Sequence, residues 1–355
     1  MIHFDWFHKH FPYPPYTNFS RGKCLTHTVT EGIISGWTAI FVFISGYLFE
    51  NLRADKFHYK MFLKRKCKTI VLPYLICSIP AIVICVVTGK FSPAYGDVGV
   101  MKGTVLNIIT GAHSVVYWYI PFVMLIFLSS PLAISFTKLS HNRQSVLLFS
   151  LFIVSAFLHR SHYNANPIHS YIYFMPLFLF GVYCSIHRDK LKELRPYAVL
   201  FLIAALALAW TQINIFNHIG LYHKNFFEFG GVDLAYIQKL FLLIFIVLAI
   251  PAIEKKSIPF LDYFAIASFP LFFLHPYIMR LFDMTHFSLV FGYNAWPSML
   301  SAFLYTTLVT SCSVIVLECF RKIFGEGCLY IIGDRKKSKL VSKRKDEVDF
   351  IIRKA

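Results

Sequence analysis

The sequence has few charged residues. They make up 15% of its 355 residues, whereas 57% are hydrophobic and the mean hydropathy is +0.58. A typical soluble domain carries about 25% charged residues. A water-soluble core could not bury this much apolar surface, so the composition excludes an ordinary soluble enzyme and favours a protein embedded in a lipid bilayer.

Acidic residues are the scarcer of the two charged kinds. Eighteen Asp and Glu stand against 35 Lys and Arg, which gives a net charge of +17. The basic residues lie between and after apolar runs, where they orient membrane proteins, so we expect no nucleic-acid partner. The near absence of carboxylates inside the apolar runs argues against a proton-driven pump.

The sequence also lacks metal-site and disulfide patterns. None of its eight cysteines forms a C-x-x-C pair, so they are expected to pack as small apolar residues. Two histidine groups, one at His3, His8 and His10 and the other at His159, His162 and His169, have no carboxylate or cysteine at ligand spacing. We therefore predict no metal.

Long apolar runs predict an all-α, polytopic transmembrane helix bundle, because backbone groups in lipid must be satisfied within helices. The expected spans lie near residues 33–50, 70–87, 115–136, 145–158, 171–186, 197–216, 236–252, 260–281 and 299–320. A stub at residues 1–7 would make about ten helices with the first one truncated. Seven residues extend about 10 Å against a core of about 30 Å, so we expect the complete protein to start upstream of Met1.

Basic residues alternate between the connecting segments. Segments 51–68, 137–144, 187–195, 254–257 and 320–355 hold 26 Lys and Arg, and the alternate segments hold seven. This asymmetry predicts a multi-pass protein of the inner (plasma) membrane with a cytoplasmic C-terminus. Residues 1–332 would form one transmembrane domain, and 333–355 a basic cytoplasmic tail that faces membrane lipid.

Four cations, Lys64, Arg65, Lys66 and Lys68, stand immediately before an apolar span. On charge alone, an anchor that touches lipid phosphates is the favoured interpretation. The alternative is a site for a phosphate-rich ligand such as coenzyme A, which Arg forks and Lys charges can bind.

Two histidines and an aromatic pair could carry chemistry. His3 in the stub and His275 in the run before Pro276 are ionisable groups expected at membrane depth, and histidine suits proton abstraction from a hydroxyl. Each could instead be structural, as an interfacial residue or a helix–helix hydrogen bond. Trp118 and Tyr119 could belong to the aromatic belt or form a platform for a sugar.

Several of these segments together resemble one family. The run FVFISGYLF at residues 41–49 resembles the second-helix signature of the membrane-bound acyltransferase type 3 family. The basic junction before Pro73 resembles its R-x-x-R element. Trp118 and Tyr119 with the Ser-Ser-Pro-Leu at 129–132 resemble its fourth helix, and Leu274-His275-Pro276 its ninth. The resemblance covers nearly the whole chain.

The resemblance implies an enzyme that moves an acyl group, acetyl or succinyl, from cytoplasmic acyl-CoA to a hydroxyl of an extracytoplasmic carbohydrate. By alignment, the family's catalytic histidine corresponds to His3, and the arginine that precedes it would lie upstream of Met1. Lys64, Arg65, Lys66 and Lys68 would bind acyl-CoA, with either Arg65 and Lys68 or Lys66 and Thr69 in the R-x-x-R positions. His275 would orient a substrate, and Trp118 and Tyr119 would contact the carbohydrate.

Two other functions remain open at this stage. One is a permease or flippase, and the other is a non-catalytic scaffold in envelope polysaccharide assembly. Consumption of acyl-CoA would distinguish the enzyme from both.

Overall fold

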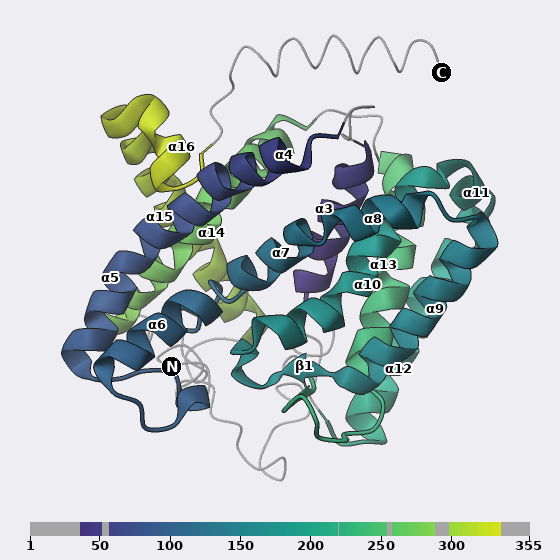
Figure 1. Cartoon of the computed structure of the whole chain (residues 1–355), viewed down its shortest axis with the longest axis horizontal. Helices are drawn as coiled ribbons and strands as arrows, with labels where there is room; N and C mark the ends of the chain where they lie inside the picture. Colours follow the sequence, from purple (N-terminus) through teal and green to yellow (C-terminus); the bar gives the residue numbers. More distant parts are fainter. Residues whose placement is uncertain (1–35, 52–56, 219, 254–257, 288–297, 335–355) are drawn as a thin grey trace.

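A computed structural model describes residues 36–51, 57–218, 220–253, 258–287 and 298–334 (Figure 1). The predicted first helix, His3 and the tail from residue 335 lie outside the described residues. The predictions about them are therefore not addressed by the structure.

The described residues form a helical bundle, which confirms the all-α prediction (Figure 1). Its α-helices are α3 (Thr38–Asn51), α4 (Tyr59–Lys66), α5 (Leu72–Thr88), α6 (Val100–Thr110), α7 (Tyr119–Leu128), α8 (Ser130–Thr137), α9 (His141–Leu158), α10 (Pro167–Ile186), α11 (Arg188–Glu193), α12 (Ala198–Asn214), α13 (Leu234–Ile253), α14 (Pro259–Met284), α15 (Ser298–Phe324) and α16 (Cys328–Ile331).

Short elements connect these helices. A π-helix, η3 (Cys67–Val71), joins α4 to α5, and 3₁₀ turns occupy η4 (Pro93–Tyr95), η5 (His162–Asn164), η6 (Arg195–Tyr197) and η8 (Gly325–Gly327). Two-residue strands β1 (Arg160–Ser161) and β2 (His223–Lys224) pair in parallel, with Arg160 opposite His223.

Eight of the nine apolar runs each coincide with one helix, and the run at 115–136 coincides with the pair α7 and α8, but the count of ten is not reached among the described residues. Five helices there are long and apolar enough to cross a bilayer, or six if α7 and α8 form one span with a 50° bend between them. Apolar side chains on the outer helices face outward, as Leu200, Ile203 and Trp210 of α12 do at 56–60% exposure. Such surfaces suit contact with lipid rather than water.

The connections gather at two opposite ends of the bundle (Figure 1). We call the end with α4, α11 and α16 the basic end, because the exposed Lys and Arg of residues 60–68 and 188–195 lie there. We call the opposite end, with β1 and β2, the loop end.

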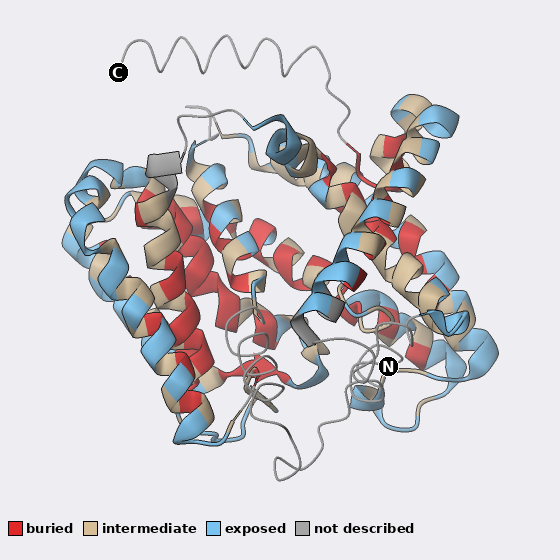
Figure 2. Cartoon of the chain, turned by 180° about the vertical axis from the view of Figure 1, so that it is seen from behind, coloured by how far each residue is buried: buried red, intermediate tan, exposed pale blue. Residues whose placement is uncertain are grey.

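Helices α3 and α10 pack closely at two glycines. A methyl group on Gly46 would lie 1.9 Å from the carbonyl oxygen of Phe178, and one on Gly181 would lie 2.1 Å from that of Phe43. Small residues let helix backbones approach in membranes. The glycine of the run at 41–49 is therefore a packing residue, and it holds α3 against the most buried helix of the bundle (Figure 2).

Candidate active site

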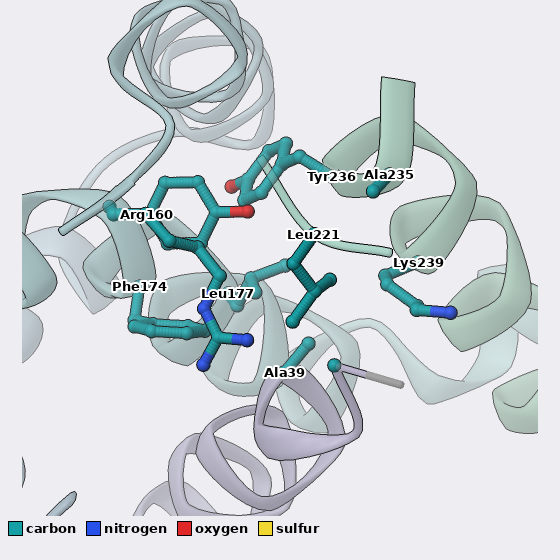
Figure 3. Close-up of a pocket in the computed structure, with 10 residues that line it drawn as sticks. Ala39, Arg160, Phe174, Leu177, Leu221, Ala235, Tyr236 and Lys239 are labelled. Carbon is teal, nitrogen blue, oxygen red and sulfur yellow. The ribbon is translucent and has the colours of Figure 1, made fainter. Parts of the chain in front are cut away.

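A pocket opens between α3, α10 and α13 at the loop end (Figure 3). Its polar wall consists of Arg160 from β1, Tyr173 from α10, and Tyr236 and Lys239 from α13. The apolar wall consists of Gly36, Ala39, Phe174, Leu177, Leu221 and Ala235.

Arg160 is buried without an anionic partner. The residue is only 6% exposed, and its Nε is buried without a hydrogen bond. Among the described residues, the guanidinium makes no ion pair and no hydrogen bond. Aromatic rings hold it instead, with its central carbon 5.2 Å from the centre of the Trp118 ring and 5.4 Å from that of Phe174. Burial lowers the pKa of this guanidinium from its ordinary value.

The short strand pair explains the position of Arg160. The backbone N–H of Arg160 donates to the carbonyl of Tyr222, and the pairing places Arg160 opposite His223. The imidazole Nδ1 of His223 lies 2.8 Å from the carbonyl oxygen of Ser161. Burial lowers the pKa of His223 to about 4, so this ring is neutral near neutral pH.

Asp233 is the carboxylate near Arg160, but its oxygens bind elsewhere. Tyr173 donates its hydroxyl to Oδ2 at 2.9 Å, and the N–H of Tyr236 donates to Oδ1 at 2.9 Å. The second contact caps the start of α13. Burial raises the pKa of Asp233 to about 6, although these hydrogen bonds and Arg160 oppose the shift.

Lys239 brings a second cation to the pocket. The residue is 5% exposed, and it is the only charged residue in α13. Gly36 lies beside it with a φ of +83°, a conformation that favours glycine. A methyl group there would lie 3.2 Å from Cε of Lys239 and 2.9 Å from the Leu221 side chain. Glycine therefore lets the chain pass close to this wall.

The predicted aromatic pair adjoins the pocket without lining it. Trp118 is buried at the start of α7 and stacks on Phe122 and Phe174, beneath Arg160. Tyr119 packs against Phe272 of α14. Both side chains thus contact protein, and the proposed sugar contact stays a prediction.

His275 lies on α14 and is not among the residues that line the pocket. Its Nδ1 is 2.9 Å from the carbonyl oxygen of Leu271, one helical turn earlier. The preceding turn of α14 meets the segment just before α7, because the Tyr117 hydroxyl donates to the carbonyl of Phe273. The structure thus brings the aromatic pair near the His275 helix, whereas the role assigned to His275 stays a prediction.

The predicted cofactor-binding cations lie at the basic end. Lys64, Arg65 and Lys68 are exposed, and Lys66 is half-buried. The Lys66 ammonium lies 4.1 Å from the centre of the Phe127 ring, and that of Lys68 lies 4.8 Å from the centre of the Tyr330 ring. The π-helix begins within this cluster, and π-helical turns are frequent at functional sites.

Sequence reasoning missed three buried polar residues, Arg160, Asp233 and Lys239, and the half-buried His113. Lys239 had a signal, since it is a charge inside an apolar run. His113 lies between α6 and α7, with Nε2 2.8 Å from Ser78 Oγ and Nδ1 2.9 Å from the Asn107 carbonyl. Burial lowers the pKa of His113 to about 4. Both ring nitrogens are engaged, so this histidine links α5 to α6.

Metal binding has no support in the part of the chain that the structure describes, where no three His, Cys, Asp or Glu side chains gather to hold an ion. That no metal is needed stays a prediction.

Fold and site define a helical membrane protein with an exposed basic junction at one end and a buried cationic pocket at the other. The family model of an acyltransferase domain, acyltransferase type 3, matches residues 1–318. The chain therefore belongs to this acyltransferase family, which confirms the resemblance found in the sequence. No curated protein and no solved structure matches the chain.

Proposed function

We propose that the protein transfers an acyl group, acetyl or succinyl, from acyl-CoA on the cytoplasmic side to a hydroxyl of an extracytoplasmic carbohydrate. The family match over residues 1–318 makes it a membrane acyltransferase. The placement of cationic sites at opposite ends of one bundle carries the finer proposal, because a donor and an acceptor on opposite sides of a membrane need separate sites.

The basic end would bind the donor. Lys64 and Arg65 are exposed and can contact the phosphates of coenzyme A, since Arg forks pair with phosphate oxygens. Lys66 and Lys68 rest on aromatic rings of other helices. These contacts would fix the direction of the two cations.

His3 would act as the general base, a role that rests on the family resemblance. It would take the proton of the acceptor hydroxyl while the hydroxyl oxygen attacks the thioester carbonyl. The bond between the carbonyl carbon and sulfur then breaks, and the coenzyme A thiolate leaves and takes up a proton. General-base catalysis typically contributes roughly 10²–10⁴-fold. His275 would orient one of the substrates.

This function requires the basic end to face the cytoplasm of an inner (plasma) membrane. Cys67 is exposed at the end of α4. An impermeant thiol reagent should therefore leave Cys67 unlabelled in intact cells and label it in inverted vesicles. Labelling of Cys67 in intact cells would reverse the orientation.

Radiolabelled acetyl-CoA and succinyl-CoA provide the direct test of the activity. Purified protein in vesicles should release coenzyme A and place the label on envelope glycans, with the modified hydroxyl identified by mass spectrometry. Glycan movement across the vesicle without acyl-CoA consumption would favour the permease or flippase instead. Absence of both activities, with normal insertion, would favour the scaffold.

A further inference from the structure

Arg160 is the one guanidinium at the loop end that lines the pocket, and no group of the described chain pairs with it. Its residue is 6% exposed and its Nε is buried without a partner. A guanidinium carries five N–H donors, and buried donors without acceptors are costly. Such a side chain points to an acceptor supplied by a ligand.

The aromatic neighbours stabilise the positive charge of the Arg160 guanidinium but accept no hydrogen bond from its N–H groups. The rings of Trp118 and Phe174 lie 5.2 and 5.4 Å from the guanidinium carbon. Cation–π contacts of this kind stabilise a cation through the ring face. They leave the edge of the guanidinium available for hydrogen bonds in the plane of the fork.

The carboxylate of Asp233 does not neutralise Arg160 by contact. Its two oxygens accept hydrogen bonds from Tyr173 and from the N–H of Tyr236. The described residues contain no ion pair between Asp233 and Arg160. The geometry therefore keeps these two groups apart, and an incoming anion would not have to displace Asp233.

The surroundings of Arg160 add positive charge. Lys239 lines the same pocket from α13, and Figure 3 shows Leu221 and Ala39 between it and Arg160 in that view. An anion in this pocket would meet one cation from β1 and another from α13. Arg forks bind carboxylates and phosphates through two parallel hydrogen bonds.

We propose that the pocket around Arg160 binds a carboxylate or phosphate group of the carbohydrate acceptor. The site would thus select an anionic glycan and hold it at the loop end of the bundle. This inference rests on the proposed function, since it assigns the chemical class of the acceptor. It concerns binding alone and involves no chemical step.

Equilibrium binding tests this assignment separately from acyl transfer. Three trisaccharides serve as probes: one that ends in glucuronate, its counterpart that ends in glucose, and one that ends in glucose 6-phosphate. Binding to the full chain in nanodiscs is measured without acyl-CoA. The two anionic probes, or one of them, should bind at least about tenfold more tightly than the neutral one, a factor that corresponds to about 1.4 kcal/mol.

Arg160→Gln should weaken binding of the preferred anionic probe by about 10- to 100-fold, which is the range for a charge-assisted pair. It should leave binding of the neutral probe unchanged. Arg160→Lys retains the charge without the fork, so its loss should be smaller; it also provides a test if the Gln variant does not fold. Arg143→Gln, at an exposed arginine of α9 near the basic end, is the matched control and should change nothing.

Equal binding of all three probes, no binding of either anionic probe, or equal effects of Arg160→Gln on charged and neutral probes would overturn the assignment. Failure of the proposed function looks different. In that case the anionic probes still bind and still require Arg160, but no acyl group is transferred to them. Absence of selectivity among the probes, together with intact acyl transfer, would contradict the anion site and leave the proposed function unaffected.

Discussion

Arg160 at the loop end and Arg321 at the basic end are both shielded from water, but their partners differ. Arg321 forms two parallel hydrogen bonds of 2.8 Å with Asp334 and a third bond of 2.7 Å with Glu318. Arg160 has aromatic rings beside it and no acceptor in the described chain. The satisfied arginine holds the fold together, whereas the unsatisfied one is available to a ligand.

The close approach of α3 and α10 shapes the pocket that Arg160 lines. Gly46→Leu should prevent folding, because even its Cβ would lie 1.9 Å from a backbone oxygen of α10. The yield of monodisperse protein in detergent measures this. Gly99→Ala is the control, since nothing lies within 4 Å of a methyl group there. A normal yield of the Leu variant would show that the helices are not packed in this way.

The same substitution at the two arginines should change stability in opposite directions. Arg321→Met removes the partner of Asp334, whose side chain is 1% exposed, and leaves that carboxylate buried. Breaking a buried pair typically destabilises a protein by about 3–5 kcal/mol. Because Arg321 is itself 15% exposed, we expect about 3 kcal/mol, measured as a fall in melting temperature.

Arg160→Met should instead stabilise the ligand-free protein, by about 1 kcal/mol, because it replaces a buried, unpaired charge with an apolar side chain. The lost contacts with Trp118 and Phe174 offset part of this gain. A strongly destabilised Arg160→Met variant would indicate that the chain itself satisfies Arg160, and the contrast between the two ends would disappear.

The cations of the basic junction should affect binding of the donor alone. Arg65→Gln combined with Lys66→Gln should raise the KM for acyl-CoA by about 5- to 10-fold and leave kcat near its original value, because phosphate contacts serve binding. Lys190→Gln, an exposed cation of α11, is the control. An unchanged KM in a correctly inserted variant would return these residues to a lipid anchor.

The smallest expected effect is a pH dependence of anion binding at the loop end, which arises from Asp233. The groups that face it are Arg160 from β1, Tyr173 from α10, and Tyr236 from α13, with Lys239 of α13 and His223 of β2 nearby. Of these, His223 stays neutral above about pH 4. Asp233, with its pKa raised to about 6, is the group that changes charge near neutral pH.

Below about pH 6 Asp233 is protonated and neutral; above it, the carboxylate opposes an incoming anion. Binding of the glucuronate probe should therefore weaken a few-fold as the pH rises from 5 to 7.5, and Asp233→Asn should flatten this profile. The raised pKa of Asp233 also means that the folded state holds this proton more tightly than the unfolded chain does. Stability should then fall as the pH rises from about 4 to about 6. A profile that Asp233→Asn leaves intact would assign the titration to another group.

The helices were predictable from the sequence because apolar run length alone determines what can lie in a bilayer. All nine runs coincide with helices. The helix α6 escaped prediction because it is only 11 residues long and carries Lys102. The bend between α7 and α8 also escaped, although Pro131 at the start of α8 marks its position.

The pocket was not predictable from local patterns. Arg160 and His223 lie 63 positions apart and are brought opposite each other by a strand pair of only two residues. A two-residue strand is too short to show the alternation of apolar and polar residues by which strands are recognised in a sequence. The basic junction, by contrast, is contiguous in sequence, and its location was predicted while its ligand stays a proposal.

The π-helix between α4 and α5 makes that junction tolerant of a change in chain length. Its i→i+5 hydrogen bonds accommodate one residue more than an α-helix would need. Deleting one residue among 67–71 would restore regular winding with little rotation of α4 relative to α5, because the wider turn already absorbs the extra residue. Lys66 would then still face the Phe127 ring. Homologues that differ by a single-residue gap at this point would accordingly present the same set of cations to their donor.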